Sequence, residues 1–145
     1  MTVRVARATL SDDAALCAIA KQHKHTKDFC SILFIRRSIE ELYAAGGIGK
    51  ATQRGKVVGF VCSKHLIRKP YTSIYYMGVD EAHTREGIGL ALIDWTFQRS
   101  PHNRIQLICE DINKSALEFY ASAGFRLLER GATKSGKTYQ RLELA

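Results

Sequence analysis

The amino-acid sequence predicts a single domain of the mixed α/β class. Along its 145 residues the hydrophobic pattern changes several times between the helical period of about 3.6 and the strand period of two. No repeat, low-complexity segment or linker divides the chain, and its length suits one domain with one core. The expected order of elements is β-α-α-β-β-β-α-β-α-β-β, and we expect the domain to span 1–145.

The first third of the chain is expected to hold one strand and two helices. Residues 2–6 alternate between apolar and polar side chains, as in a strand. Thr9 and Asp12 have the spacing of a capping box, and an apolar stripe follows them at helical spacing. Residues 32–45 carry a second helical stripe, which Gly46 and its glycine neighbour would end.

The middle of the chain changes to the strand pattern. Residues 48–65 alternate with period two around a turn at Arg54-Gly55, which is typical of a β-hairpin. A basic loop containing Pro70 follows, and then a β-rich apolar strand at 73–79. Two helices and three strands complete the chain, the first helix ending before Pro101 and the second before Gly124.

The predicted bounds of all elements are as follows. We expect helices at about 9–22, 32–45, 87–99 and 113–123. We expect strands at 2–6, 48–53, 56–65, 73–79, 104–110, 125–129 and 137–144, with a loop at 130–136 between the last two.

The composition excludes a membrane-spanning class. Hydrophobic residues make up 46% of the chain and charged residues 25%, as in ordinary globular proteins. No apolar run approaches the about 18 residues that a spanning helix needs. The first ten residues lack the apolar core of a signal peptide. We therefore expect a cytoplasmic protein without a membrane partner.

The strand at 73–79 leads through Gly87-Ile88-Gly89 into a helix. A helix N-terminus has free N–H groups and a positive dipole end, and glycines let a phosphate come close. The pattern therefore favours a phosphate or pyrophosphate site, although an ordinary tight connection has the same pattern. It is not a P-loop, because no Gly-Lys-Ser/Thr follows, and it lacks the third glycine of a dinucleotide fingerprint.

The chain is strongly basic, with 22 lysines and arginines against 14 acidic residues and a net charge of +8. Such a surplus predicts an anionic partner: nucleic acid, a polyanionic cofactor or an acidic substrate. Part of it serves solubility alone.

The cysteines and histidines give little support for a metal site. The four cysteines are widely spaced, at Cys17, Cys30, Cys62 and Cys109, without a Cys-x-x-Cys pair. This excludes a disulfide framework and a cysteine-based zinc site. His23 and His25 with Cys30 form a weak metal candidate, and we expect no metal.

Two motifs resemble those of the GNAT superfamily of N-acetyltransferases. Residues 84–89, TREGIG, resemble the family's acetyl-CoA pattern Arg/Gln-x-x-Gly-x-Gly/Ala. Residues 113–125 resemble its Asn-x-x-Ala-x-x-Phe-Tyr-x-x-x-Gly-Phe segment, which is the more specific of the two. The order of elements is similar along nearly the whole chain. Thr84 stands where the family has Arg or Gln, and Arg85 beside it carries a charge that compensates.

The resemblance implies a fold and an activity. The fold is the single-domain GNAT-type acyl-CoA N-acyltransferase fold of the α/β class, a central, mixed and mostly antiparallel sheet flanked by four helices. The activity is transfer of an acetyl group from acetyl-CoA to a primary amine by direct attack.

The resemblance also implies site residues. Backbone amides of 85–90 would hold the diphosphate, and the edge of the strand at 77–79 would hold the pantetheine. An N–H near Gly78 or Val79 would face the thioester oxygen. Tyr120 would protonate the departing thiolate. The cofactor-binding set is Met77, Gly78, Val79, Arg85, Glu86, Gly87, Ile88, Gly89, Leu90, Asn113 and Tyr120, with Tyr120 also catalytic.

Several of these residues have a purely structural alternative. Tyr120 follows Phe119 on a helix and packing alone would explain it. Asn113 is also a good helix N-cap. Gly78 is typical of a β-bulge, which in this family splays the sheet at that place. The general base stays open among a water relay and the side chains of Tyr76, Glu81, Glu110 and His65.

The acceptor is expected to contact two basic segments, 21–37 and 130–137. Their charge disfavours polycationic acceptors and favours an acidic small molecule, an acidic protein segment or an amine carried on nucleic acid. Three hypotheses follow: an acetyl-CoA-dependent N-acetyltransferase, a nucleic-acid-directed acyltransferase on the same fold, and a non-catalytic CoA-binding module. The choice between a monomer and a homodimer stays open.

Overall fold

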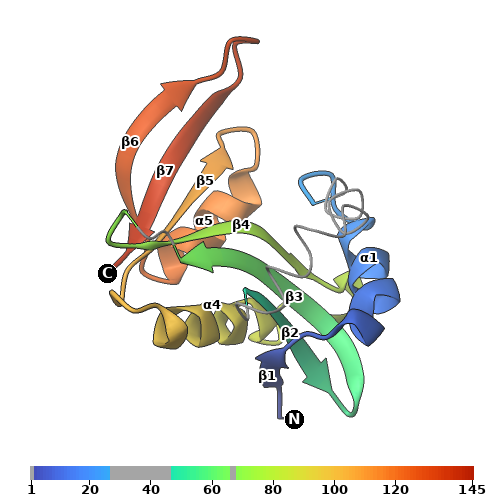
Figure 1. Ribbon diagram of the computed structural model, residues 1–145. Helices are drawn as coiled ribbons and strands as arrows, with labels where there is room; N and C mark the ends of the chain where they lie inside the picture. Colours follow the sequence, from blue (N-terminus) through green and yellow to red (C-terminus); the bar gives the residue numbers. More distant parts are fainter. Residues whose placement is uncertain (1, 27–46, 66–67) are drawn as a thin grey trace.

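A computed structural model describes residues 2–26, 47–65 and 68–145 (Figure 1). Within these ranges the chain forms seven strands and three α-helices. The strands are β1 (Arg4–Arg7), β2 (Ile48–Gln53), β3 (Lys56–His65), β4 (Thr72–Val79), β5 (Ile105–Glu110), β6 (Arg126–Ala132) and β7 (Thr138–Leu144). The helices are α1 (Asp13–Ala20), α4 (Ile88–Arg99) and α5 (Lys114–Ser122), with short 3-10 helices η1 (Leu10–Asp12) and η2 (Glu81–His83). The helix predicted at 32–45 lies outside the described residues.

Most predicted bounds agree with the structure, and β2 and β3 match in full. The capping box is confirmed, because the Thr9 N–H donates to Asp12 Oδ2 over 2.8 Å, but it opens η1 rather than the α-helix itself. The prediction for the last hairpin was wrong, because β6 continues to Ala132. Gly131 looked like a loop residue, yet it pairs with Tyr139, whose ring fills the space of a Cβ there.

The seven strands form one sheet in the order β1-β2-β3-β4-β5-β7-β6. Every neighbouring pair is antiparallel except β4 with β5, so the predicted mixed and mostly antiparallel sheet is confirmed. The parallel pair is very short, joining only Thr72 to Ile105 and Ser73 to Gln106. Beyond Ser73 the two strands diverge, and the sheet opens into a fork (Figure 1).

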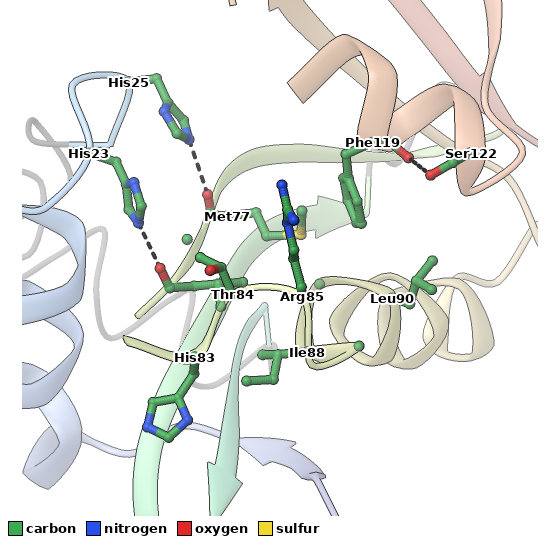
Figure 2. A pocket seen from close by; sticks show the side chains of 14 residues that line it. His23, His25, Met77, His83, Thr84, Arg85, Ile88, Leu90, Phe119 and Ser122 are labelled. Atoms are coloured by element: carbon green, nitrogen blue, oxygen red, sulfur yellow. Dashed lines mark hydrogen bonds between the residues drawn. The ribbon is translucent and has the colours of Figure 1, made fainter. Parts of the chain in front are cut away.

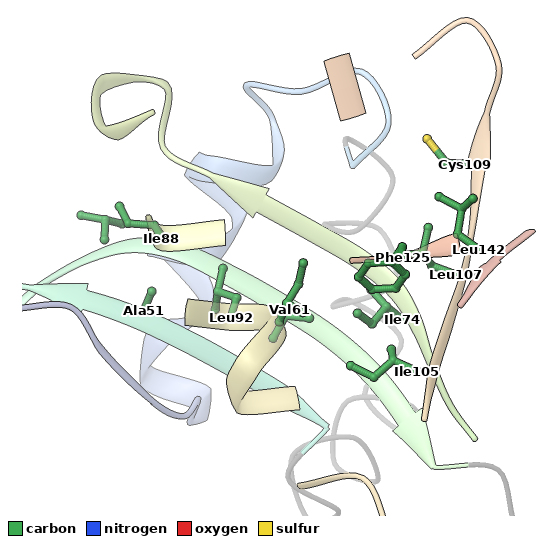
Figure 3. Close-up of a cluster of buried hydrophobic side chains, with 12 residues drawn as sticks. Ala51, Val61, Ile74, Ile88, Leu92, Ile105, Leu107, Cys109, Phe125 and Leu142 are labelled. Carbon is green, nitrogen blue, oxygen red and sulfur yellow. The ribbon is translucent and has the colours of Figure 1, made fainter. Parts of the chain in front are cut away.

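The helices cover opposite faces of this sheet. Alternate β3 side chains point to opposite faces, so Phe60 joins the core cluster of α1 and Val61 joins that of α4. Ile88 and Leu92 of α4 lie with Val61 and Ile105 in the larger cluster (Figure 3), which also takes in side chains of α5. The core therefore holds α4 and α5 on one face, beside the fork.

The bulge in β4 lies at Tyr75 and not at Gly78, the place that the structural alternative for this glycine suggested. Cys62 pairs with Tyr76 and the next residue, Ser63, pairs with Ile74, so Tyr75 is the extra residue. Gly78 sits in regular register opposite Phe60. A Cβ at Gly78 would lie 2.9 Å from the Phe60 ring, so the glycine there makes room for a core side chain.

Among the described residues, no helix is long and apolar enough to cross a membrane.

Leu92 gives a direct test of the α4 core. It is fully buried, while Leu90 on the same helix is 45% exposed. We expect Leu92→Ala to lower the free energy of unfolding by about 2–5 kcal/mol, because it removes packed methyl groups and leaves a cavity. Urea denaturation would measure this, with Leu90→Ala as the matched control. Equal effects of the two substitutions would contradict the described packing.

Candidate active site

Two pockets meet at the fork. The first, of about 470 Å³, lies over the glycine turn and is named here the turn pocket. Its lining includes His23, His25, Met77, Gly78, Val79, His83, Thr84, Arg85, Gly87, Ile88, Gly89, Leu90, Phe119 and Ser122 (Figure 2). The second, of about 940 Å³, is named the fork pocket. Its lining includes Lys24, His25, Met77, Glu110, Asn113, Tyr120 and Lys137, with residues 74–76, 107–109 and 136–138.

The peptide groups of β4 alternate between β3 and the fork. The Asp80 N–H donates to Val58 O over 2.8 Å, so between the bulge at Tyr75 and Asp80 the even-numbered residues, Tyr76 and Gly78, also bond to β3. By this alternation Gly78 directs its N–H and C=O toward β3. Met77 and Val79 direct theirs toward the fork, where β5 has moved away. These two residues therefore form a strand edge that pairs with no other described strand, called here the free edge.

Two histidines occupy that edge. His23 Nε2 lies 2.7 Å from Val79 O, and His25 Nε2 lies 3.3 Å from Met77 O (Figure 2). Sequence reasoning had considered the two histidines only as metal ligands, and Cys30, their suggested partner, lies outside the described residues. In the described part of the chain, no group of three His, Cys, Asp or Glu side chains is placed to hold a metal ion. In the sequence, the one indication that both rings could contact the same strand is that the two histidines stand two residues apart.

The glycine turn is built by left-handed backbone. Gly87 has φ +80° and Arg85 has φ +63°, a region that favours glycine. Ile88 is buried and anchors the start of α4, while the Arg85 side chain rises into the turn pocket (Figure 2). The first N–H groups of α4 therefore face this pocket beside a guanidinium, an arrangement suited to an anion.

Gly89 and Glu86 each have a structural contact. A Cβ at Gly89 would lie 2.8 Å from Phe119 Cζ, so this glycine allows α5 to pack against α4 besides lining the turn pocket. The Glu86 side chain lies 2.8 Å from His83 Nδ1, and Glu86 lines neither pocket. All the other predicted cofactor residues line one pocket or both.

Tyr120 both packs and faces the fork pocket. Its ring makes edge contacts with Phe119 and Phe125, each with 5.4 Å between centroids. Burial, with a smaller effect of the nearby Cys109, raises the pKa of Tyr120 well above the usual range. The phenol therefore keeps its proton at neutral pH. The packing role and the expected proton-donor role of Tyr120 are therefore compatible.

Asn113 occupies the N-cap position of α5, yet its side chain makes no capping hydrogen bond. It lines the fork pocket instead.

The candidates for a general base differ in whether they line a pocket. Tyr76 and Glu110 line the fork pocket, whereas Glu81 and His65 line neither. His65 bonds to Thr72 Oγ1 over 2.7 Å, at the far end of β4 from the glycine turn.

A family model described as Acetyltransferase (GNAT) family matches residues 11–125. The chain belongs to the GNAT family of acetyltransferases. The resemblance of its two motifs to this family is thereby confirmed, and with it an acetyl-CoA-dependent acyltransferase.

One curated relative is substantially similar in sequence. The 5-NmdU N-acetyltransferase of Pseudomonas phage PaMx11 is 32% identical over 121 residues, which cover 83% of this chain and 85% of that protein.

Solved structures share the GNAT fold. Ard1 from Thermoplasma volcanium has a TM-score of 0.80 at 19% identity, covering 99% of this chain and 97% of its own. The acetyltransferase yncA from Salmonella typhimurium, solved with acetyl-CoA, has a TM-score of 0.72 at 16% identity, covering 99% and 94%. At these identities the likeness concerns the fold alone.

Proposed function

We propose that this GNAT protein acetylates a primary amine carried by a nucleotide of a nucleic acid, by direct attack of the amine on the thioester of acetyl-CoA. The observation that carries the proposal is the free edge of Met77 and Val79, which lies where the turn pocket and the fork pocket meet. A donor on the turn side and an acceptor on the fork side would meet at this edge.

The turn pocket suits the donor. Backbone N–H groups at the start of α4 and the Arg85 guanidinium would bind the diphosphate. The pantetheine would extend along the free edge of β4 as an added strand does. One of its amide N–H groups would replace the His23 ring as the partner of the Val79 carbonyl. The Thr84 side chain carries no charge, so Arg85 would supply most of the side-chain contribution to diphosphate binding.

The same edge suits the thioester oxygen. An N–H must point at this oxygen as negative charge develops on it. Gly78 turns its N–H toward β3, so Met77 and Val79 are the better donors. This sharpens the expectation, which had named Gly78 or Val79.

The chemical step then needs little from the protein. The lone pair of the amine attacks the carbonyl carbon, the C–N bond forms, and the C–S bond breaks with its electron pair going to sulfur. Tyr120 donates a hydrogen bond to that sulfur and passes its proton on as the charge grows. Because its pKa is raised, the phenol is protonated and able to donate when the donor binds. Asn113 would hold the donor from the other wall of the fork.

The acceptor is supported by charge and by a relative. The phage relative is named a 5-NmdU N-acetyltransferase. The hairpin of β6 and β7 projects beyond the sheet (Figure 1) and carries Arg130, Lys134 and Lys137 on its exposed surface. Lys137 lines the fork pocket together with Lys24. These cations would draw a phosphate backbone to the acceptor side.

The diphosphate site can be tested at Arg85. We expect Arg85→Gln to weaken acetyl-CoA binding about tenfold, because a charged hydrogen bond to phosphate is lost. Calorimetry would measure this, with S-acetylpantetheine, which lacks the diphosphate, as the control ligand. A loss of the same size for both ligands would place Arg85 elsewhere on the donor.

Tyr120 can be tested by removing only its hydroxyl. We expect Tyr120→Phe to lower kcat about 100-fold, the range of a lost proton donor, without weakening acetyl-CoA binding. The reaction rate would be measured by the release of free thiol. Tyr139→Phe, outside both pockets, serves as the control. An unchanged kcat in Tyr120→Phe would leave this residue a packing role only.

The nucleic-acid acceptor predicts a salt effect on the hairpin. We expect the double substitution Lys134→Gln and Lys137→Gln to weaken binding of duplex DNA containing 5-NmdU. The slope of log K against log salt should fall by about 1 for each phosphate that the variant no longer neutralises. Lys64→Gln with Lys69→Gln, two cations outside both pockets, is the matched control. Acetylation of the free nucleoside with a kcat/KM equal to that of the duplex would count against a nucleic-acid acceptor.

A further inference from the structure

An attacking amine must lose a proton close to the thioester. The pKa of a primary alkylamine is near that of lysine, about 10.4, so it arrives as an ammonium without a lone pair. A proton acceptor must therefore stand between the acceptor pocket and the donor edge. None of the general-base candidates named from the sequence lines both pockets and so stands between acceptor and donor.

His25 has it. Among the described residues, His25 and Met77 alone line both the turn pocket and the fork pocket. The ring of His25 lies over Met77 on the open side of β4, with Nε2 3.3 Å from Met77 O (Figure 2). An amine that enters through the fork pocket and approaches this edge passes the imidazole.

The hydrogen bond to Met77 also sets the proton on the ring. A carbonyl oxygen only accepts, so Nε2 of His25 carries the hydrogen. In the neutral imidazole Nδ1 then keeps its lone pair. That nitrogen is the basic atom of the side chain.

The surroundings keep this imidazole neutral. Burial lowers the pKa of His25, the charge of His23 lowers it further, and the bond to Met77 opposes both effects. The titratable side chains that share its pockets are His23, Lys24, Tyr75, Tyr76, His83, Arg85, Cys109, Glu110, Tyr120 and Lys137. Glu110 is the one carboxylate in this set.

The other bases are less well placed. Glu110 is exposed at the end of β5 and reaches only the fork pocket. Tyr76 also reaches only the fork pocket, and its phenol is a poor proton acceptor at neutral pH. His23 lines only the turn pocket and binds Val79 O.

We infer that His25 is the general base of this acetyltransferase. The inference rests on the proposed direct attack by an amine. Nδ1 takes one proton from the ammonium, the freed lone pair forms the C–N bond, and the C–S electron pair leaves with the sulfur, which takes the proton of Tyr120. The nitrogen then gives its second proton, made acidic by the new C–N bond, to the Tyr120 phenolate. His25 becomes an imidazolium and returns its proton to solvent after the product departs. His25 would then be a catalytic residue in contact with the substrate.

The test compares His25→Gln with His102→Gln, using n-butylamine and duplex DNA containing 5-NmdU as acceptors. We expect His25→Gln to lower kcat about 100-fold with acetyl-CoA affinity within twofold of the wild type. His102 is exposed and lines neither pocket, so His102→Gln should keep both kcat and donor affinity within twofold. In the wild type, kcat at saturating amine should rise with pH through a pKa below the ordinary 6.5 of histidine. This limb should vanish in His25→Gln.

Chemical rescue separates catalysis from structure. Added imidazole should restore at least a tenth of the wild-type kcat to His25→Ala, because the free base can enter the vacated space. A kcat within threefold of the wild type in His25→Gln, an unchanged pH limb, or no rescue in folded His25→Ala would each overturn the inference. Activity of the wild type on n-butylamine but not on duplex DNA, with the expected His25 effects, would remove the nucleic-acid acceptor and support His25.

Discussion

The divergence of β4 and β5 after two paired residues is the constraint on which the rest of the structure depends. The strands are held together at their start by Thr72, whose N–H donates to Arg104 O and whose hydroxyl, fully buried, bonds to Ser100 and His65. Past this point the fork is wide enough for pockets on both sides of the β4 edge. A fully paired sheet would bury that edge.

The free edge has a cost that the histidines offset. An unpaired backbone carbonyl in a partly buried place loses hydrogen bonds to water, and this is unfavourable unless a partner replaces them. His23 and His25 supply partners for Val79 and Met77. An arriving donor would therefore exchange the hydrogen bond from His23 for one of its own, while His25 would keep its bond to Met77.

Local patterns in the sequence predicted the elements well, because period and capping residues act over a few positions. The hairpin of β2 and β3 and the capping box at Thr9 are examples. The bulge at Tyr75 escaped prediction because strand register depends on both partners. The length of β6 was not predicted because the glycine at 131 is explained by a contact outside its own segment. Gly131 pairs with Tyr139, eight residues away, and leaves room for its ring. His25 escaped because its partner, Met77, is 52 residues along the chain.

Phe119 resting against Gly89 has a wider consequence. The two motifs that mark the family stand apart in the sequence, but this contact joins their helices into one joint. A methyl group at position 89 would displace the ring of Phe119, the residue next to Tyr120 on α5. Under the proposed function, this contact would couple the binding of the diphosphate to the position of Tyr120 at the leaving sulfur. A substitution in this turn that alters donor affinity would then also alter the rate of the reaction at the thioester end of the same donor molecule.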